Sequence, residues 1–347
     1  MTETTATERT FEIVPVDNDD DAALKAWHDV YLAADTFERP FVTPWQYEEM
    51  LAMVRGDPET WERISYLGLE DGVPVATLGA QLPLRDNLSN AMFLTHTLPD
   101  RRRRGHATRL LERLESDLAP RGRTVLQSDV DFAYDLGPDG PGEPGVEFLR
   151  ARGFAFALGN VQSSLDLPVD ETVLAKLAEG AAPYHRDYTM VEYVGRCPDE
   201  HVESFAALQE IFMDEAPMGE MTVEREVYDE ARIRNSEEVL VAAQRVQYMT
   251  LALDKTGAVV AFTQLVVPRL DPGRVFQWGT IVHPDHRGHR LGTALKVANH
   301  AQVQRHETDL RICHTYNAEV NAHMIAVNQL LGYRPTARLG EFEKRLA

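Results

Sequence analysis

The amino-acid sequence predicts two consecutive α/β domains, each built on a mixed sheet, and an internal repeat is the main reason. Residues 99–107 (PDRRRRGHA) recur as residues 284–292 (PDHRGHRLG), at an offset of 284 − 99 = 185. A glycine followed by an aromatic residue, at Gly153 and again at Gly332, gives a second offset of 332 − 153 = 179. Two landmarks in the same order at nearly equal offsets indicate that a whole domain was duplicated. The length of 347 residues agrees with two domains of ordinary size.

The first half is predicted to contain a strand, helices, a three-stranded meander, a helix, a strand, a helix and a last strand. Apolar stretches between turn residues indicate the strands, and Asp71-Gly72 supplies the positive φ of a tight hairpin turn. A Pro/Gly-rich loop is expected at 137–145. The predicted strands are residues 11–16, 64–69, 73–82, 91–98 and 124–129, and the predicted helices are residues 22–34, 108–115 and 145–153.

The second half repeats this order, which places the first domain at residues 1–166 and the second at 188–347. Residues 167–187 form the link, and their Ala-rich part, 171–182, is expected to be a helix. The predicted strands are residues 188–194, 248–253, 259–267, 275–282 and 310–315, and the predicted helices are residues 200–212, 293–299 and 321–332.

The repeated motif has the form expected of a pyrophosphate site. A strand, then Arg-x-x-Gly-x-Ala, then a helix turns several backbone N–H groups toward one point, where the helix N-terminus adds partial positive charge. The first copy has Arg102, Gly105 and Ala107 at this spacing. The second keeps Arg287 but has Arg290 in place of the first glycine, and an arginine side chain there is able to meet a phosphate itself.

The motif with its downstream glycine–aromatic end resembles the signature of the GNAT superfamily of acyl-CoA-dependent N-acyltransferases. Residues 315–333 resemble that superfamily's fifth strand and fourth helix, and the layout is similar to the tandem type that includes mycothiol synthase. The resemblance implies two tandem GNAT-like domains that use acetyl-CoA or another acyl-CoA as co-substrate, with no metal. It also implies direct attack by an amine of a small molecule or peptide, with the C-terminal domain active. The alternative is a non-catalytic CoA-binding sensor or scaffold.

The resemblance assigns CoA binding to the end of each fourth strand, the loop and the helix start. In the second domain it implies Ile281, Val282, His283, Arg287, Gly288, His289, Arg290, Leu291, Gly292 and Thr293, with Asn317, Asn321 and Asn328 as partners of the pantetheine amides or phosphates. In the first domain it implies Thr97, Leu98, Arg102, Arg103, Arg104, Gly105, His106 and Ala107. The superfamily's usual acid, a tyrosine four residues before the glycine–aromatic end, is replaced by Asn328 and Leu149, neither of which can protonate a thiolate.

The acceptor side is expected at residues 212–230, because in this fold the segment between the first two helices covers the acceptor cleft. Such an acidic, lysine-free rim would attract a cationic amine; the alternative is a solvated acidic surface. Its acidic residues are Asp214, Glu215, Glu220, Glu224, Glu226, Asp229 and Glu230. Glu215 and Glu220 are the candidate general bases, since Pro217 and Gly219 beside them predict a turn.

Composition limits the partners further. With 35 Lys+Arg and 55 Asp+Glu, the net charge is −20, which disfavours nucleic acids and acidic membrane surfaces. Two cysteines, an N-terminus without a secretory pattern and no long apolar run predict a cytoplasmic protein. His283, His286 and His289 are interpreted as loop residues, since metal sites usually draw ligands from two elements. The sequence leaves the oligomeric state and the acceptor open.

Overall fold

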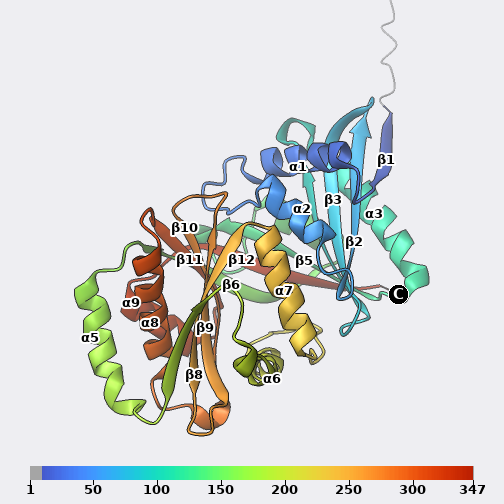
Figure 1. Ribbon diagram of the computed structural model, residues 1–347. Helices are drawn as coiled ribbons and strands as arrows, with labels where there is room; N and C mark the ends of the chain where they lie inside the picture. Colours follow the sequence, from blue (N-terminus) through green and yellow to red (C-terminus); the bar gives the residue numbers. More distant parts are fainter. Residues whose placement is uncertain (1–9, 347) are drawn as a thin grey trace, which may run out of the picture. The chain divides into compact units, whose positions relative to one another are not determined.

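The computed structural model describes residues 10–346, apart from the side chains of residues 212–214 (Figure 1). It contains two compact units. The first consists of the chain up to Leu84, Leu88–Asp129 and the residues from Glu343 onward; the second consists of Arg85–Asn87 and Val130–Phe342. The repeat divides the chain elsewhere, at residues 166 and 188, and those boundaries stay a prediction because proximity and duplication are different criteria.

The first unit is a sheet in the order β1-β2-β3-β4-β5, in which only β4 and β5 are parallel neighbours. Alternation along β2 places Leu67 in a core with the helices α1 and α2, whereas Tyr66 points the other way and donates its hydroxyl to Asp117 of α3 (2.5 Å). The two faces of the sheet are therefore covered by different helices. The elements are β1 Phe11–Val16, α1 Asp21–Asp35, α2 Tyr47–Arg55, β2 Trp61–Glu70, β3 Val73–Pro83, β4 Asn90–Thr97, the short helix η1 Pro99–Arg101, α3 His106–Leu118 and β5 Val125–Ala133, whose end belongs to the second unit.

The second unit is a sheet in the order β12-β6-β11-β10-β9-β8-β7. Strand β6, which the repeat places in the first domain, pairs antiparallel with β11. The elements are α4 Pro144–Ala151, β6 Ala155–Asp166, α5 Glu171–Ala181, β7 Thr189–Val194, α6 Asp199–Glu215, α7 Glu230–Ala242, β8 Arg245–Leu253, β9 Val259–Pro268, β10 Arg274–Val282, the short helix η5 Pro284–His286, α8 Leu291–His306, β11 Ile312–Ala318, α9 Ala322–Leu331 and β12 Arg334–Arg345, which ends in the first unit.

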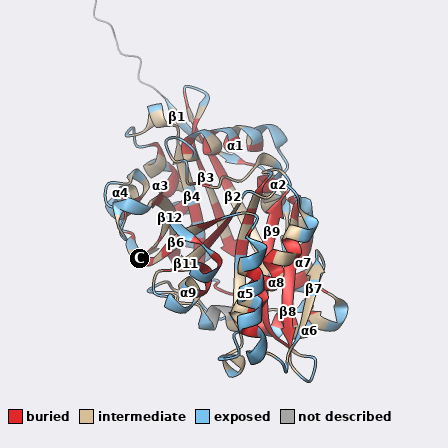
Figure 2. Ribbon diagram, turned by 90° about the vertical axis from the view of Figure 1, so that its left-hand side faces the viewer, coloured by how far each residue is buried: buried red, intermediate tan, exposed pale blue. Residues whose placement is uncertain are grey.

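Two cores lie on the two faces of this second sheet. Tyr248 packs with residues of α5 and α8, while its neighbour Met249 packs with residues of α6 and α7. Strands β8 and β9 between these layers are buried almost throughout, as Figure 2 shows. None of the helices in residues 10–346 combines the length and the apolar character that a membrane span requires.

The predicted mixed α/β fold is confirmed, and most elements lie where the pattern indicates. The predicted strand at 11–16 is β1, and the helix expected at 171–182 is α5. The predicted loop at 137–145 is wrong at its end, because α4 already begins at Pro144. Proline is favoured in the first turn of a helix, where its missing N–H costs nothing.

Candidate functional site

The two copies of the repeated motif have nearly the same backbone shape. Leu98 and His283, which precede η1 and η5, have φ/ψ of −49°/137° and −49°/136°. Both donate their N–H to the preceding strand: Leu98 to Val75 C=O (2.9 Å) and His283 to Val260 C=O (2.9 Å). The offset between these acceptors is 260 − 75 = 185, the same as that of the motif. The repeat in sequence is therefore also a repeat in structure.

Each loop contains two residues in the left-handed region, where glycine is favoured. In the first loop these are Arg103 (φ 63°) and Gly105 (φ 83°); in the second they are Gly288 (φ 84°) and Arg290 (φ 51°). Each loop thus has one glycine and one arginine, in opposite order. Arg290, which interrupts the sequence motif, leaves the backbone of the second loop in the same conformation as the first.

Both loops lie after a strand that diverges from its parallel neighbour. Strand β4 pairs with β5 only over Asn90–Met92, and β10 pairs with β11 only over Arg274–Gln277. Beyond these residues the later part of each strand has no ladder on that side. This divergence leaves backbone groups on that side of each later strand segment outside any strand pairing.

A β-bulge distinguishes the second copy from the first. The pairing of β10 with β9 shifts between Gln277 and Thr280, where β10 has one residue more than β9. Trp278, in this bulge, is 41% exposed. In the first copy, β4 pairs with β3 from Met92 to Thr97 without a shift. A bulge leaves backbone groups outside the ladder and re-aims its side chains, which is common beside active sites.

The end of β10 offers one backbone donor toward the divergence. The His283 N–H is already used by Val260 C=O, on the β9 side. Because successive N–H groups of a strand point to opposite sides, the Val282 N–H points to the side from which β11 has diverged. Of the three residues expected to contact CoA at the end of this strand, Ile281, Val282 and His283, Val282 is the one whose N–H points to this side.

The N-terminus of α8 presents further donors. The first hydrogen bond of this helix runs from Ala294 N–H to Arg290 C=O (3.0 Å), so the N–H groups of Leu291, Gly292 and Thr293 precede the helical ladder. A side chain added at Gly292 would meet no heavy atom within 4 Å. Open backbone with several N–H groups at a helix start fits an anionic diphosphate.

The side chains of the second loop have other contacts. Arg290 donates to Gly180 C=O (3.0 Å), and its guanidinium carbon lies 4.1 Å from the ring centroid of Tyr184. His289 Nδ1 is 3.1 Å from Tyr184 C=O, and His286 Nδ1 is 3.0 Å from the Tyr188 hydroxyl. The Arg290 side chain, which was expected to meet a phosphate, instead contacts the C-terminal end of α5 and Tyr184 in this structure. Among the described residues no group of His, Cys, Asp or Glu is arranged to hold a metal ion.

Three of the four arginines of the first loop, Arg101, Arg102 and Arg104, also have protein partners, whereas Arg103 is exposed. Arg101 and Arg104 both donate to the buried carboxylate of Glu70 (2.7 and 3.0 Å). Arg102 donates to Thr97 C=O (3.2 Å) and Ala34 C=O (3.1 Å). The cationic run that looks like a phosphate site in the sequence serves mainly to hold the loop.

The three asparagines differ in their roles. Asn321 is the N-cap of α9 and accepts from Met324 N–H (3.2 Å), which explains an asparagine there. Asn328 donates to Asn317 Oδ1 (2.6 Å). Asn328 is 3% exposed, and its own Oδ1 has no hydrogen-bond partner within the described part of the chain.

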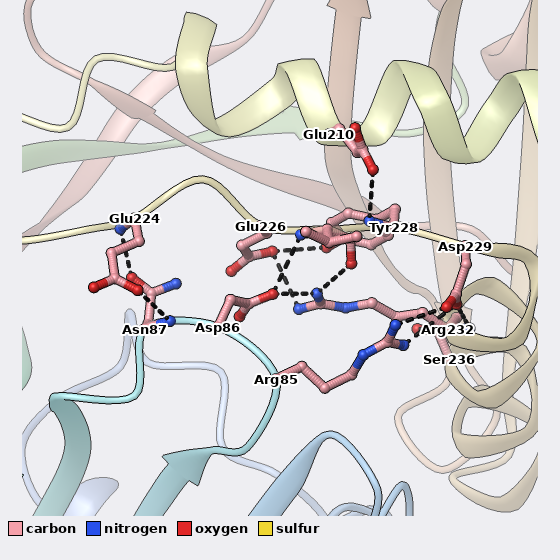
Figure 3. A network of polar contacts seen from close by, with 11 residues as sticks. Arg85, Asp86, Asn87, Glu210, Glu224, Glu226, Tyr228, Asp229, Arg232 and Ser236 are labelled. Carbon is pink, nitrogen blue, oxygen red and sulfur yellow. Dashed lines mark hydrogen bonds and ion pairs between the residues drawn. The ribbon is translucent and has the colours of Figure 1, made fainter.

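The acidic segment is tied down by its carboxylates, as Figure 3 shows. Asp86 accepts from Arg232 (2.6 Å), and both side chains are less than 10% exposed. Asn87 and Glu224 exchange two hydrogen bonds (3.0 and 2.6 Å). Hydrogen bonding from Arg85 lowers the pKa of Asp229 to about 2. The expectation of an open acidic rim is wrong for two of its residues, because Asp229 is paired with Arg85 and the Glu224 carboxylate accepts a hydrogen bond from Asn87 N–H.

The two candidate bases lie in different environments. Glu215 is the last residue of α6, not part of a turn as predicted, and its carboxylate pairs with Arg287 of the second loop. Glu220 does lie in a turn; its side chain is exposed, and its N–H donates to Ala157 C=O (3.0 Å). The side chain of Asp214 is outside the described residues.

Two parts of this arrangement were missed from the sequence. The bulge had a signal, since Gly279 is an isolated glycine inside a strand pattern. The contacts of residues 85–87 with the acidic segment and α7 had no signal in the local sequence, because Asp86 and its partner Arg232 are 146 positions apart.

Comparisons with known proteins agree with the geometry. Residues 205–332 match the Acetyltransferase (GNAT) family model. A tandem GNAT protein from the clavulanic acid biosynthesis pathway is 29% identical, with a TM-score of 0.78 over 97% of this chain and 98% of its own. A GCN5-related N-acetyltransferase from Sphaerobacter thermophilus shares the fold at 14% identity, with a TM-score of 0.61 over 96% and 95%. No match was found among curated proteins.

A third structure, the glucosamine N-acetyltransferase region of a fungal multi-domain β-N-acetylglucosaminidase, is 14% identical with a TM-score of 0.64, over 97% of this chain and 38% of its own. At such identity the likeness concerns the fold. The family model and the tandem structure point the same way: residues 205–332 belong to the Acetyltransferase (GNAT) family, and the whole chain is similar in fold to a tandem GNAT protein.

Proposed function

We propose that this chain transfers an acyl group, most simply acetyl, from an acyl-CoA to an amine of a small molecule or peptide, and that the C-terminal domain performs the reaction. The observation that carries the proposal is the bulge in β10 beside its divergence from β11. The equivalent strand β4 diverges from β5 but has no bulge. CoA supplies the acyl group as an activated thioester.

The residues present fit such a co-substrate. The N–H groups at the start of α8 and the open backbone at Gly292 would hold the diphosphate. The gap between β10 and β11 would hold the extended pantetheine arm. The Val282 N–H is placed to donate to the carbonyl oxygen of the acyl group, where negative charge develops during attack.

The contacts of the two candidate carboxylates, Glu215 and Glu220, indicate which of them accepts the proton from the amine. Glu215 is engaged by Arg287, whereas the exposed Glu220 has no ion pair within the described part of the chain. We therefore place the acceptance of the amine proton on Glu220. Asn328 cannot supply a proton to the leaving thiolate, so water does so.

The first domain is proposed to be inactive in transfer. Its loop has the same backbone conformation as the second loop. Arg102, however, donates to the carbonyls of Thr97 and Ala34, and β4 has no bulge in its pairing with β3. The first domain would then have a structural role, or it would bind CoA without transferring the acyl group.

The test is thiol release. Acetyl-CoA is incubated with the full chain and a panel of polyamines, amine-bearing antibiotics and peptides with free N-termini, and free CoA is measured beside calorimetric binding of CoA. We expect binding, and release that depends on one class of amine. Binding with no release on any amine would favour the CoA-binding sensor instead, and absence of binding at millimolar CoA would contradict the proposal.

Arg290→Gly is expected to change CoA affinity by less than about threefold. The arginine side chain contacts Gly180 and Tyr184, and glycine adopts the left-handed backbone without strain. Calorimetric titration of CoA measures the effect. If this variant bound CoA a hundredfold more tightly, Arg290 would be blocking the second loop, and the first loop would become the preferred site.

A further inference from the structure

Among the described residues the Arg287 guanidinium has one partner, the Glu215 carboxylate, and under the proposed function it gains a second one in the complex with CoA. We propose that Glu215 and the CoA diphosphate compete for Arg287, so that CoA binding frees one end of the acceptor-side segment 216–229. The inference rests on the proposed function, since it requires CoA at the second loop.

The contact that CoA would replace is weak. The Arg287 side chain is 54% exposed and that of Glu215 is 30% exposed, so water screens the pair. Only Nη2 of Arg287 is used, which leaves the other guanidinium donors free of this carboxylate. A diphosphate offers more charge and several acceptor oxygens for the planar guanidinium. The exchange therefore favours the diphosphate.

The other end of the segment is held much more firmly. Asp86 and Arg232 form an ion pair that is almost fully buried, and Arg232 also donates to Val227 C=O (2.8 Å). Asn87 and Glu224 add two hydrogen bonds (Figure 3). Breaking a buried pair leaves an uncompensated charge, whereas breaking an exposed pair does not. Loss of the ion pair between Glu215 and Arg287 would thus release only the N-terminal end of segment 216–229.

The middle of the segment transmits this release to Glu220. Between the two ends, Glu220 N–H donates to Ala157 C=O (3.0 Å), and Met221 N–H donates to Met218 C=O (3.0 Å). The backbone is close to β6 here, because a Cβ on Gly219 would lie 2.3 Å from Ala157 O. Glu220, the proposed base, is five positions from the attachment that CoA removes. CoA binding would thereby prepare the acceptor side before the amine arrives.

The test titrates CoA into the full chain by calorimetry, and no acceptor is needed. Glu215→Gln is expected to bind CoA about fivefold more tightly, because the competing charge is gone. Glu192→Gln is the matched control: Glu192 pairs with Arg305 at the other end of α8, and the two side chains are 34% and 56% exposed. This control should bind like the wild type. Equal or weaker binding by Glu215→Gln, with normal binding by the wild type, overturns this inference alone.

A double-mutant cycle separates competition from general charge. In an Arg287→Gln background, Glu215→Gln should no longer change CoA affinity. A persisting fivefold gain would assign the effect to long-range electrostatics and overturn the competition. If neither the wild type nor any variant bound CoA, the proposed function would fail, and this inference with it.

Hydrogen exchange supplies the structural readout. CoA should speed exchange of the Glu220 and Met221 amides in the wild type, while in Glu215→Gln exchange should already be fast without CoA. Unchanged or slower exchange of these amides in the wild type on CoA addition would contradict the release.

Discussion

Lys296→Met is expected to raise the free energy of unfolding by about 4 kcal/mol at pH 7. Lys296 lies on α8 and is 1% exposed. Burial lowers its pKa from 10.5 to about 7. In the unfolded chain the ammonium is hydrated, so folding must either remove its proton or bury its charge. Methionine has a similar length and avoids both costs.

The lowered pKa of Lys296 also determines how the free energy of unfolding changes with pH. Between pH 7 and 10.5 the unfolded lysine binds a proton that the folded one does not, so stability rises with pH. The wild type should gain roughly 1.4 kcal/mol per pH unit between about pH 7 and 9, and Lys296→Met should lack this gain. Urea unfolding at the two pH values measures it. Above pH 9 Cys313 opposes the trend, because burial raises the pKa of its thiol from 9.0 to about 12.

The surroundings of Lys296 explain why its charge is not compensated. The polar groups near it include His300, whose pKa burial lowers to about 3, and the protonated Cys313. Tyr333 donates to Cys313 Sγ (3.0 Å), and burial raises the pKa of its own hydroxyl. Lys176→Met, an exposed lysine on α5, is the control and should change stability by less than about 0.5 kcal/mol. A destabilised Lys296→Met, or an unchanged pH slope, would contradict this account.

The two motif loops show which features of the site can be predicted from local sequence. Pro, Arg and Gly at fixed spacing between a strand and a helix were enough to predict both loops, because turn geometry and helix starts depend on neighbouring residues. The role of Arg290 was not predictable from the same residues. Its side chain meets Gly180 and Tyr184, 110 and 106 positions earlier, and no local pattern reports such contacts.

The acidic segment shows the same limit more strongly. From the sequence, Glu224, Glu226 and Asp229 are expected on an acidic rim of the acceptor cleft, because a sequence shows charges but not their partners. In the structure their partners include Asn87, Arg232 and Arg85, and two of these come from a three-residue stretch far away in the chain. Glu215 was recognised as a chemically relevant carboxylate, but its pairing with Arg287 required the tertiary structure.

Gly292→Glu is expected to weaken CoA binding about 100-fold or more while leaving the fold intact. At the first turn of α8 a carboxylate is favourable for the helix itself, since it faces the unpaired N–H groups. It would, however, occupy the position proposed for the diphosphate. Two like charges about 4 Å apart at a protein surface repel by roughly 4 kcal/mol. Calorimetric titration of CoA, beside a thermal unfolding curve without ligand, separates binding from stability.

Two variants at the same position isolate the charge from the bulk. Gly292→Gln adds a side chain of the same size without the charge, and Gly292→Ala adds only a methyl group, for which the structure has open space within 4 Å. Both should keep CoA affinity within about tenfold of the wild type, because neither adds a negative charge beside the diphosphate. If Gly292→Glu bound CoA as well as Gly292→Gln does, the diphosphate would not lie at the N-terminus of α8. The phosphate site of this chain would then have to be sought at the first loop, where Gly105 has the same open space.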